Sequence, residues 1–347
     1  MFSSWRLPLL PLCARDSGQS VYDRTSSFGD TGQLQESAFA RPLPVNPKVS
    51  VVCVTYTRRD LVLKCLKSCI EQDYPSLEIL VVVNPSGDGT EEAIQQTFPE
   101  IRILRTHTNI GFFPALNLAI ANTSGDYVMA VDDDAYFLKR DAITNLVNAF
   151  REEPRLGAVT CSLEGPHEVP TEGADRYISV FTTGFTMVPR QVYTHWAGYF
   201  PDIFFRSAGE TYVCTRLWEL GRPVKRLHNV RMYHERAMQG RSDRDWKFYG
   251  LKSQILCAFM RDPWYFLPFH LCSKGVRSLF QYIGWGHAGT WAQAWIGAFY
   301  HLPEALKLRQ PIHWRTQRLL WRLRKEMIRS PLPSFIPPKS MMSANKS

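Results

Sequence analysis

The sequence of 347 residues predicts an α/β protein with a doubly wound, mostly parallel sheet, followed by a helical C-terminal extension. Short apolar runs alternate with amphipathic stretches from Lys48 to about residue 162, which is typical of repeated βαβ units. The apolar content of 45% and the aromatic content of 13% are those of a globular protein. Beyond residue 250 the sequence becomes richer in aromatic residues, and this change predicts a second region.

Apolar runs and helical spacing predict the individual elements in order along the chain. Residues 49–55 predict a buried strand, and the apolar residues between Val62 and Cys69 share one face of a following helix. Turn-forming residues from Asn84 to Thr90 separate the second strand from its helix. The other predicted elements are strands at residues 78–83, 101–104, 127–131 and 158–162, helices at residues 113–122 and 141–151, strand-like residues 177–188, and a helix at residues 210–221 that ends at Gly221.

Three consecutive carboxylates, Asp132, Asp133 and Asp134, follow the fourth predicted strand. Neighbouring carboxylates make one another harder to ionise, and a divalent cation removes that repulsion. Mg²⁺ and Mn²⁺ prefer carboxylate oxygens, and an open α/β sheet places its ligands at the carboxyl ends of its strands. The acidic run therefore indicates a metal site, with a solvated acidic turn as the alternative for an isolated run of this kind.

Further motifs accompany the acidic run in a fixed order over about residues 48–236. They are Thr55-Tyr56-Thr57-Arg58, Asn84-Pro85-Ser86-Gly87-Asp88, Asn109-Ile110-Gly111, Asn117, Gly125-Asp126, Asp132-Asp133-Asp134, Gly209-Glu210, Arg216 with Gly221, and Tyr233-His234. In this order they resemble the family 2 glycosyltransferases of GT-A fold, of the inverting, rhamnosyltransferase-like kind. The resemblance implies transfer of a sugar from a nucleoside diphosphate donor, of UDP or dTDP type, to a hydroxyl group.

The resemblance implies roles for the acidic run and for one histidine. Asp134 is expected to bind Mg²⁺ or Mn²⁺, and Asp132 is expected to contact the ribose side of the donor. Asp133 is left open between a metal ligand, a donor contact and a residue that merely keeps the turn polar. His234 matches a family histidine near the metal or the diphosphate, so we expect it to be a second metal ligand.

Residues that follow the first two strands are expected to line the nucleoside pocket. They are Thr55, Tyr56, Arg58, Asn84 and Asp88. Asn109 and Gly111 match a loop that approaches the donor, where Gly111 lets the backbone come close. Val83 departs from the family pattern, because most relatives carry an aspartate there that is expected to reach the pyrimidine. Asn84 is the neighbour that could compensate for this substitution.

The attacking hydroxyl needs a carboxylate base on the face opposite the departing diphosphate. Relatives carry this base in an acidic pair before a helix that contains an arginine and ends in glycine. Here the corresponding residues are Glu210, Arg216 and Gly221, so Glu210 is the expected base. A glutamate stabilised by the dipole at a helix N-terminus is the alternative. Gly184 begins a segment that lies under the acceptor in relatives.

Two other functions are compatible with this fold. A sugar-phosphate nucleotidyltransferase would need a glycine-rich basic loop after the first strand, and residues 55–60 contain no glycine. A non-catalytic, membrane-associated nucleotide-sugar-binding protein is supported only by Val83. Processive polysaccharide synthases usually carry Gln-x-x-Arg-Trp and several membrane spans, which are not evident here. We therefore expect transfer of a single sugar to a lipid-linked or polysaccharide acceptor.

The same features predict how the chain is organised. We expect a loosely ordered leader at residues 1–47, the transferase domain at 48–240, a helical aromatic and basic region at 241–330, and a flexible tail at 331–347. The eight cysteines include no CxxC pair, which predicts a reducing, cytosolic environment and no zinc site.

The C-terminal region indicates an anionic partner. Residues 301–347 hold ten Lys and Arg against two acids, which favours anionic lipid head groups over the rival partner, nucleic acid. A solvated helical face is the third interpretation. Residues 278–303 contain no Asp, Glu, Lys or Arg, but their aromatic residues are spread throughout, which favours a helical pair in the interface over a span. We expect a peripheral protein on the cytoplasmic face of the membrane, and the sequence does not indicate its oligomeric state.

Overall fold

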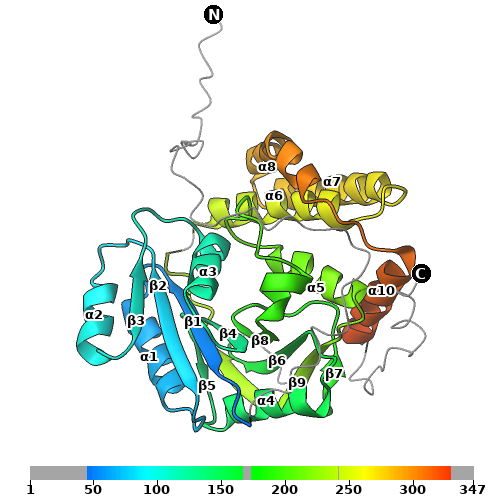
Figure 1. Ribbon diagram of the computed structural model, residues 1–347. Coiled ribbons are helices and arrows are strands. Elements are labelled where there is room, and N and C mark those ends of the chain that lie inside the picture. Colours follow the sequence, from blue (N-terminus) through cyan, green and yellow to red (C-terminus); the bar gives the residue numbers. More distant parts are fainter. Residues whose placement is uncertain (1–44, 167–172, 241, 330–347) are drawn as a thin grey trace, which may run out of the picture. The chain divides into compact units, whose positions relative to one another are not determined.

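The computed structural model of the protein describes residues 45–166, 173–240 and 242–329. The chain from Val45 onward forms one compact unit, whose elements are labelled in Figure 1. The leader predicted for residues 1–47 lies almost entirely outside the described residues, and the tail predicted for residues 331–347 lies wholly outside them.

Nine strands of the described chain form one sheet in the order β3-β2-β1-β4-β8-β6-β9-β5, with β7 paired to β9. The strands are β1 (Val49–Thr55), β2 (Leu77–Val83), β3 (Arg102–Arg105), β4 (Tyr127–Asp132), β5 (Ala135–Phe137), β6 (Ala158–Glu164), β7 (Arg176–Tyr177), β8 (Phe185–Pro189) and β9 (Val224–His234). The first four run parallel, and β8 inserts antiparallel between β4 and β6. The predicted α/β fold with a mostly parallel sheet is confirmed.

Helices connect the strands and continue beyond the sheet. They are α1 (Arg59–Ile70), α2 (Thr90–Thr97), α3 (Phe112–Ala121), α4 (Ala142–Glu152), α5 (Gly209–Glu219), α6 (Asp243–Arg261), α7 (Leu267–Gly284), α8 (Ala288–Tyr300), α9 (Leu302–Lys307) and α10 (Trp314–Arg329), with a short π-helix at Val192–Trp196. Helix α3 packs on β1 and β2, α4 on β6 and β9, and α5 on β9.

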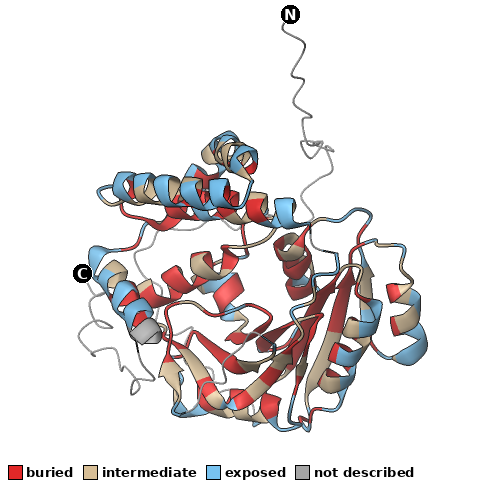
Figure 2. Ribbon diagram, turned by 180° about the vertical axis from the view of Figure 1, so that it is seen from behind, coloured by how far each residue is buried: buried red, intermediate tan, exposed pale blue. Residues whose placement is uncertain are grey.

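The core lies where the uninterrupted apolar strands meet the helices. Every residue of β1 is buried, as expected for a strand covered on both faces. Helix α1 buries Val62, Cys65, Leu66 and Cys69, so the single apolar face predicted from their spacing is confirmed. Figure 2 shows this buried material along the central strands and the inner sides of the helices.

The segment predicted as one strand over residues 177–188 is in fact β7 and β8 with a turn between them. The turn is closed by backbone hydrogen bonds from Phe185 N to Thr182 O and from Thr186 N to Thr183 O. Strand β5 was not predicted, because three residues are too few to show a periodic pattern. Both differences concern the site, since the turn and β5 each lie beside the acidic run.

The C-terminal helices are attached to the sheet domain through α6. Arg261 of α6 is buried, and its guanidinium lies 3.8 Å from the ring centroid of Tyr212 on α5. Its Nε donates to Tyr212 O at 3.1 Å, and its Nη1 donates to Gln310 O at 3.2 Å. These bonds and the ring contact join α6 to α5 and to the chain at Gln310, although Nη2 of Arg261 makes no hydrogen bond to a described residue.

Residues 278–303, which contain no Asp, Glu, Lys or Arg, form the end of α7, all of α8 and the start of α9, with short connections between these helices. In the part of the chain that the structure describes, no helix is long and apolar enough to cross a membrane. The seven cysteines of that part are free thiols.

Candidate active site

A cavity of about 260 Å³ opens where the carboxyl ends of β1 and β4 lie side by side. Most of the residues predicted for the site contribute to its lining. They are Thr55, Tyr56, Arg58, Asn84, Asn109, Gly111, Asp132, Asp133 and Glu210. Residues from four separate loops therefore meet at one edge of the sheet, where open α/β sheets bind their ligands.

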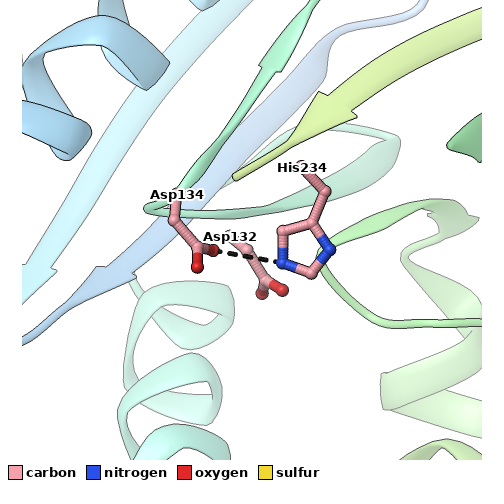
Figure 3. A group of neighbouring side chains, drawn as sticks. All are labelled: Asp132, Asp134 and His234. Atoms are coloured by element: carbon pink, nitrogen blue, oxygen red, sulfur yellow. Dashed lines mark ion pairs between the residues drawn. The ribbon is translucent and has the colours of Figure 1, made fainter. Parts of the chain in front are cut away.

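Asp132, Asp134 and His234 form a group beside this cavity that could hold a metal ion. One ligand atom of each lies within 4.8 Å of the others, and Figure 3 shows the three side chains converging. Oδ1 of Asp134 is 3.4 Å from Nε2 of His234. Asp132 ends β4, and Ala135 at the start of β5 pairs with His234 at the end of β9. The register of β5 against β9 thus brings the histidine to the acidic run.

The chemistry of this group fits a divalent cation. His234 is buried, and neither of its ring nitrogens makes a hydrogen bond to any described residue. The ring packs against Phe185, with centroids 4.9 Å apart. A buried imidazole without a hydrogen-bond partner is costly, whereas a nitrogen that binds a metal is satisfied. Two carboxylates and one imidazole are suitable ligands for ions such as Mn²⁺.

Arg58 holds the acidic run in place. Its Nη1 donates to Oδ1 of Asp133 at 2.7 Å and lies 3.1 Å from Oδ2 of Asp134. The remaining donors bind backbone, Nη2 to Ala237 O at 2.7 Å and Nε to Gln239 O at 3.1 Å. Arg58 lines the cavity as predicted, but most of its hydrogen-bonding capacity serves the protein itself. It offsets the repulsion among the carboxylates.

Asp133, whose role the sequence left open, is the buried partner of Arg58. Burial raises the pKa of Asp133, and the neighbouring Arg58 charge works against that increase. The amide of Tyr56 also points to its carboxylate, at 3.4 Å. Asp133 therefore connects the end of β1 to the acidic run.

Of the residues discussed for the nucleoside pocket, Asn84 lines the cavity, whereas Val83 and Asp88 do not. Asn84 is buried, and its Oδ1 accepts hydrogen bonds from Ile110 N at 3.1 Å and from Thr106 Oγ1 at 3.0 Å. It thereby fixes the loop that carries Asn109. Val83 is only 4% exposed within the sheet, so its side chain belongs to the core.

Asp88 is not brought to the cavity by the fold. Its Oδ1 accepts hydrogen bonds from Ser86 Oγ at 2.6 Å and from the amide and hydroxyl of Thr90. The bond from the amide of Thr90 satisfies one backbone donor at the start of α2, where amides lack partners within the helix. The structure thus places this residue at a helix start, although the sequence predicted it in the pocket wall.

Gly111 makes its close approach to another loop of the protein. Its φ of +89° lies in the region that favours glycine, and a Cβ there would lie 2.5 Å from Phe205 O. The neighbouring amide of Phe112 donates to the same oxygen at 2.8 Å. Gly111 and Phe205 both line the cavity, and the predicted close approach of the donor to Gly111 stays a prediction.

Glu210 lies in the first turn of α5 and is only partly exposed. Desolvation raises the pKa of its carboxyl, and the polar groups of its own amide and of the neighbouring Thr183 oppose that increase. Ser207 and Ala208, just before the helix, adopt φ of 65° and 66°, which is uncommon for residues with a Cβ. A carboxylate with a raised pKa at the wall of the cavity is suited to accept a proton.

Several lining residues were missed from the sequence. They are Thr182, Thr183, Phe205, Arg206 and Gln239. All of them lie in irregular segments, where neither helical nor strand periodicity gives a signal. The family match pointed only to Gly184, which closes the turn that carries the two threonines.

Gly184 is expected to be intolerant of any side chain, because a Cβ at this position would overlap the carboxylate of Asp132. We predict that Gly184→Ala displaces Asp132 and weakens nucleotide binding about tenfold, or about 1.4 kcal/mol. Calorimetric titration with a nucleoside diphosphate and Mn²⁺ measures this loss. Gly289→Ala in α8 is the matched control, since no atom lies within 4 Å of the added Cβ. Equal affinity in both variants would contradict the prediction.

A parallel α/β sheet with a carboxylate metal group at its edge defines this protein as one of GT-A architecture. Solved structures share the fold. The mannosyltransferase PcManGT from Pyrobaculum calidifontis, in complex with GDP-Man and Mn²⁺, matches with a TM-score of 0.50 at 21% identity, over 83% of this chain and 89% of that one. S. aureus TarS 1–349 in complex with UDP-GlcNAc gives 0.54 at 17% identity, over 80% and 87%.

Sequence comparison shows which family part of the chain resembles. Residues 50–206 match the model of glycosyl transferase family 2. The poly-β-1,6-N-acetyl-D-glucosamine synthase of Staphylococcus epidermidis is 30% identical over 135 residues, covering 37% of this chain and 32% of the relative. The putative colanic acid biosynthesis glycosyl transferase WcaA of Escherichia coli is 31% identical over 94 residues, covering 26% and 33%. The match thus spans about a third of each relative. Residues 50–206 thus match the glycosyl transferase family 2, and the relatives that resemble them are glycosyltransferase enzymes.

Proposed function

We propose that the protein is an inverting glycosyltransferase that moves one sugar from a nucleoside diphosphate donor, of UDP or dTDP type, to a hydroxyl group of a glycan or lipid-linked acceptor. One observation carries this proposal. Asp132 and Glu210 line the same cavity. Asp132 also belongs, with Asp134 and His234, to the group that could hold a metal ion. A donor-binding end and a proton-accepting end are therefore present in one site.

The proposed reaction assigns the proton to Glu210. Its carboxylate accepts the proton of the acceptor hydroxyl as that oxygen bonds to the anomeric carbon. The bond from this carbon to the diphosphate oxygen breaks at the same time, and the electron pair leaves with the nucleoside diphosphate. Attack from the face opposite the leaving group inverts the configuration. A base with a raised pKa takes the proton more readily than an ordinary glutamate.

Asp132, Asp134 and His234 are the proposed ligands of Mg²⁺ or Mn²⁺. Bound there, either ion supplies positive charge that stabilises the departing diphosphate. Arg58 keeps two of the three consecutive carboxylates oriented, because it binds Asp133 and Asp134 directly. The names of the neighbours support the donor class, since TarS was crystallised with UDP-GlcNAc and PcManGT with GDP-Man and Mn²⁺.

The relatives also support a place in surface polysaccharide synthesis. Their names include a poly-β-1,6-N-acetyl-D-glucosamine synthase and the putative WcaA and TuaG enzymes for colanic and teichuronic acid. We extend the proposal to a peripheral protein on the cytoplasmic face of the membrane, where nucleotide sugars and growing lipid-linked glycans meet. The basic and aromatic C-terminal region supports this location.

A screen of nucleotide sugars tests the proposal. The purified full chain is incubated with UDP-, dTDP- and GDP-sugars and Mn²⁺ or Mg²⁺, and thermal stabilisation and nucleoside diphosphate release are measured. We expect at least one donor to stabilise the protein and to release its diphosphate slowly, by hydrolysis, when no acceptor is added. Release of pyrophosphate in a parallel incubation with nucleoside triphosphates and sugar 1-phosphates would instead indicate a nucleotidyltransferase. If a nucleotide sugar stabilises the protein against heat but no diphosphate is released with any acceptor, the result would indicate a binding protein.

A further inference from the structure

A second cavity of about 360 Å³ lies between α6 and α7, and we refer to it as the α6–α7 groove. Ser207 lines this groove and also lines the donor cavity. The same residue shortly precedes Glu210 in the chain. The groove therefore opens beside the proposed base, on the side of residues 205–208 that faces the C-terminal helices.

Helix α6 fixes the segment that separates the two cavities. Ser253 Oγ donates to Arg206 O at 3.0 Å, and Tyr249 stacks on Phe205 with ring centroids 4.4 Å apart. Phe205 and Arg206 line the donor cavity from the other side. The segment between the cavities is thus held in place by its contacts with α6.

The lining of the α6–α7 groove is basic and contains no Asp or Glu among the described residues. Its cationic side chains are Lys247, Lys274 and Arg277, with His270 at one end. Trp246, Tyr282 and Trp285 add aromatic surface. A third cavity, of about 250 Å³, shares His270 and Lys274 and continues from the groove toward α10.

Two of these cations are poorly compensated. The Nζ of Lys274 donates to Gln254 Oε1 at 3.0 Å, and desolvation lowers its pKa although Asp262 acts in the opposite direction. Asp262 is itself hydrogen bonded to His270. Arg277 is exposed and makes no hydrogen bond or ion pair with any described residue.

Lys247 differs from the other two, because Asp243 pairs with it and Trp285 lies 4.9 Å from its Nζ. The positive charge left over in the groove is therefore that of Lys274 and Arg277. An anionic group placed between them would be held by charge-assisted hydrogen bonds, and phosphate oxygens are suited to this geometry.

The neighbouring face of α7 is apolar and exposed. Phe269, Val276, Phe280 and Ile283 recur at helical spacing, and Phe269 and Phe280 are 71% and 70% exposed. Helix α7, at the upper left of Figure 2, is buried only on the side that packs on α6 and α8. An apolar stripe beside a basic groove matches the boundary between lipid chains and anionic head groups.

We propose that the α6–α7 groove is the acceptor site and that the acceptor is a lipid-linked phosphate, bound through its phosphate to Lys274 and Arg277. This inference rests on the proposed glycosyl transfer and specifies its acceptor. The lipid chain leaves the groove over the apolar stripe of α7, while the hydroxyl end passes Ser207 toward Glu210. The aromatic side chains of the groove provide surfaces on which the intervening sugar or lipid segment stacks.

Flotation of the full-length protein with vesicles tests this inference without any transfer assay. One set contains phosphatidylcholine with phosphatidic acid, a lipid phosphomonoester, and a second set contains phosphatidylserine adjusted to the same surface charge. We expect tighter binding to the first set. Lys274→Gln is expected to weaken that binding at least about tenfold, as the loss of one charge-assisted phosphate contact predicts. Lys307→Gln on the exposed surface of α9 is the matched control and should bind like the wild type.

Further arms separate a lipid from other occupants of the groove. Phe280→Ser is expected to weaken vesicle binding. Because Phe280 is exposed, the substitution is not expected to unfold the protein. Equal binding to both vesicle sets, or no effect of Lys274→Gln, would overturn the inference. The inference would also be overturned if inorganic pyrophosphate bound as tightly as the vesicles and Phe280→Ser did not change that binding. A third contrary result would be a wild-type protein that does not bind vesicles but forms a dimer, which dissociates in Phe280→Ser. The apolar stripe of α7 would then serve self-association, and the inference would be wrong.

The vesicle measurements and the nucleotide-sugar screen fail independently. If no nucleotide sugar binds while Lys274→Gln still abolishes selective vesicle binding, the proposed transfer is wrong and the phosphate site stands. If sugar is transferred to soluble glycans and Lys274→Gln does not change vesicle binding, the proposed transfer is confirmed but its acceptor has been assigned wrongly.

Discussion

Glu210→Gln is expected to lower the rate of sugar transfer by about 10³-fold or more, because general-base catalysis contributes on the order of 10²–10⁴-fold. The amide of glutamine keeps the size of the side chain but does not accept the proton at neutral pH. Because Glu210 lies at the wall of the cavity, in the first turn of α5, we expect no change in the affinity for the donor. Steady-state rates and calorimetric donor binding, measured on the same preparation, test both statements.

Two controls accompany this prediction. Glu152→Gln alters an exposed glutamate at the end of α4 and should leave both measurements unchanged. The wild-type rate should fall as the pH decreases through the pKa of Glu210, since the base must be ionised. Because desolvation raises that pKa, the decline is expected to begin at a higher pH than for an ordinary glutamate. Near-full turnover of Glu210→Gln would reject the assignment of the base.

Removal of the metal is the second large effect that we expect. Treatment with a chelator should abolish transfer, and added Mn²⁺ or Mg²⁺ should restore it. Asp134→Asn is expected to weaken Mn²⁺-dependent nucleotide binding about 100-fold or more, because it removes a charged ligand from the group with Asp132 and His234. Calorimetry with UDP in the presence and absence of Mn²⁺ measures the change directly.

Asp134 also accepts from Ala237 N at 2.9 Å, so its substitution could disturb folding. His234→Gln provides an independent variant, since the ring makes no hydrogen bond within the described chain. Asp60→Asn, on the exposed side of α1, serves as the control for loss of a carboxylate. Donor binding that is equally tight with and without Mn²⁺ in the wild type would contradict a metal site.

The fold and much of the site follow from local sequence patterns. The uninterrupted apolar residues of β1 and the helical spacing in α1 predict the α/β sheet directly. The acidic run can be placed at a strand end because the preceding residues of β4 are apolar and buried. These predictions succeed because each depends only on neighbours in the chain.

Features that depend on contacts between distant segments were not predictable in the same way. His234 reaches the acidic run only through the pairing of β5 with β9, and three residues of β5 carry no pattern. Arg58 was predicted as a pocket residue, but its partners Ala237 and Gln239 lie in a loop far along the chain. Asp88 does not line the cavity, and the sequence alone does not distinguish a turn aspartate that faces a ligand from one that precedes a helix.

The turn at residues 182–184 has a consequence for redesign of the site. Thr183 in this turn contacts Glu210. Gly184 lies so close to the carboxylate of Asp132 that there is no space for a side chain at this position. The gap between the leaving-group end and the proton-accepting end is thus set by three residues. A variant intended to accept a bulkier sugar would have to displace this turn. Because the turn contacts both Asp132 and Glu210, these two side chains would move as well.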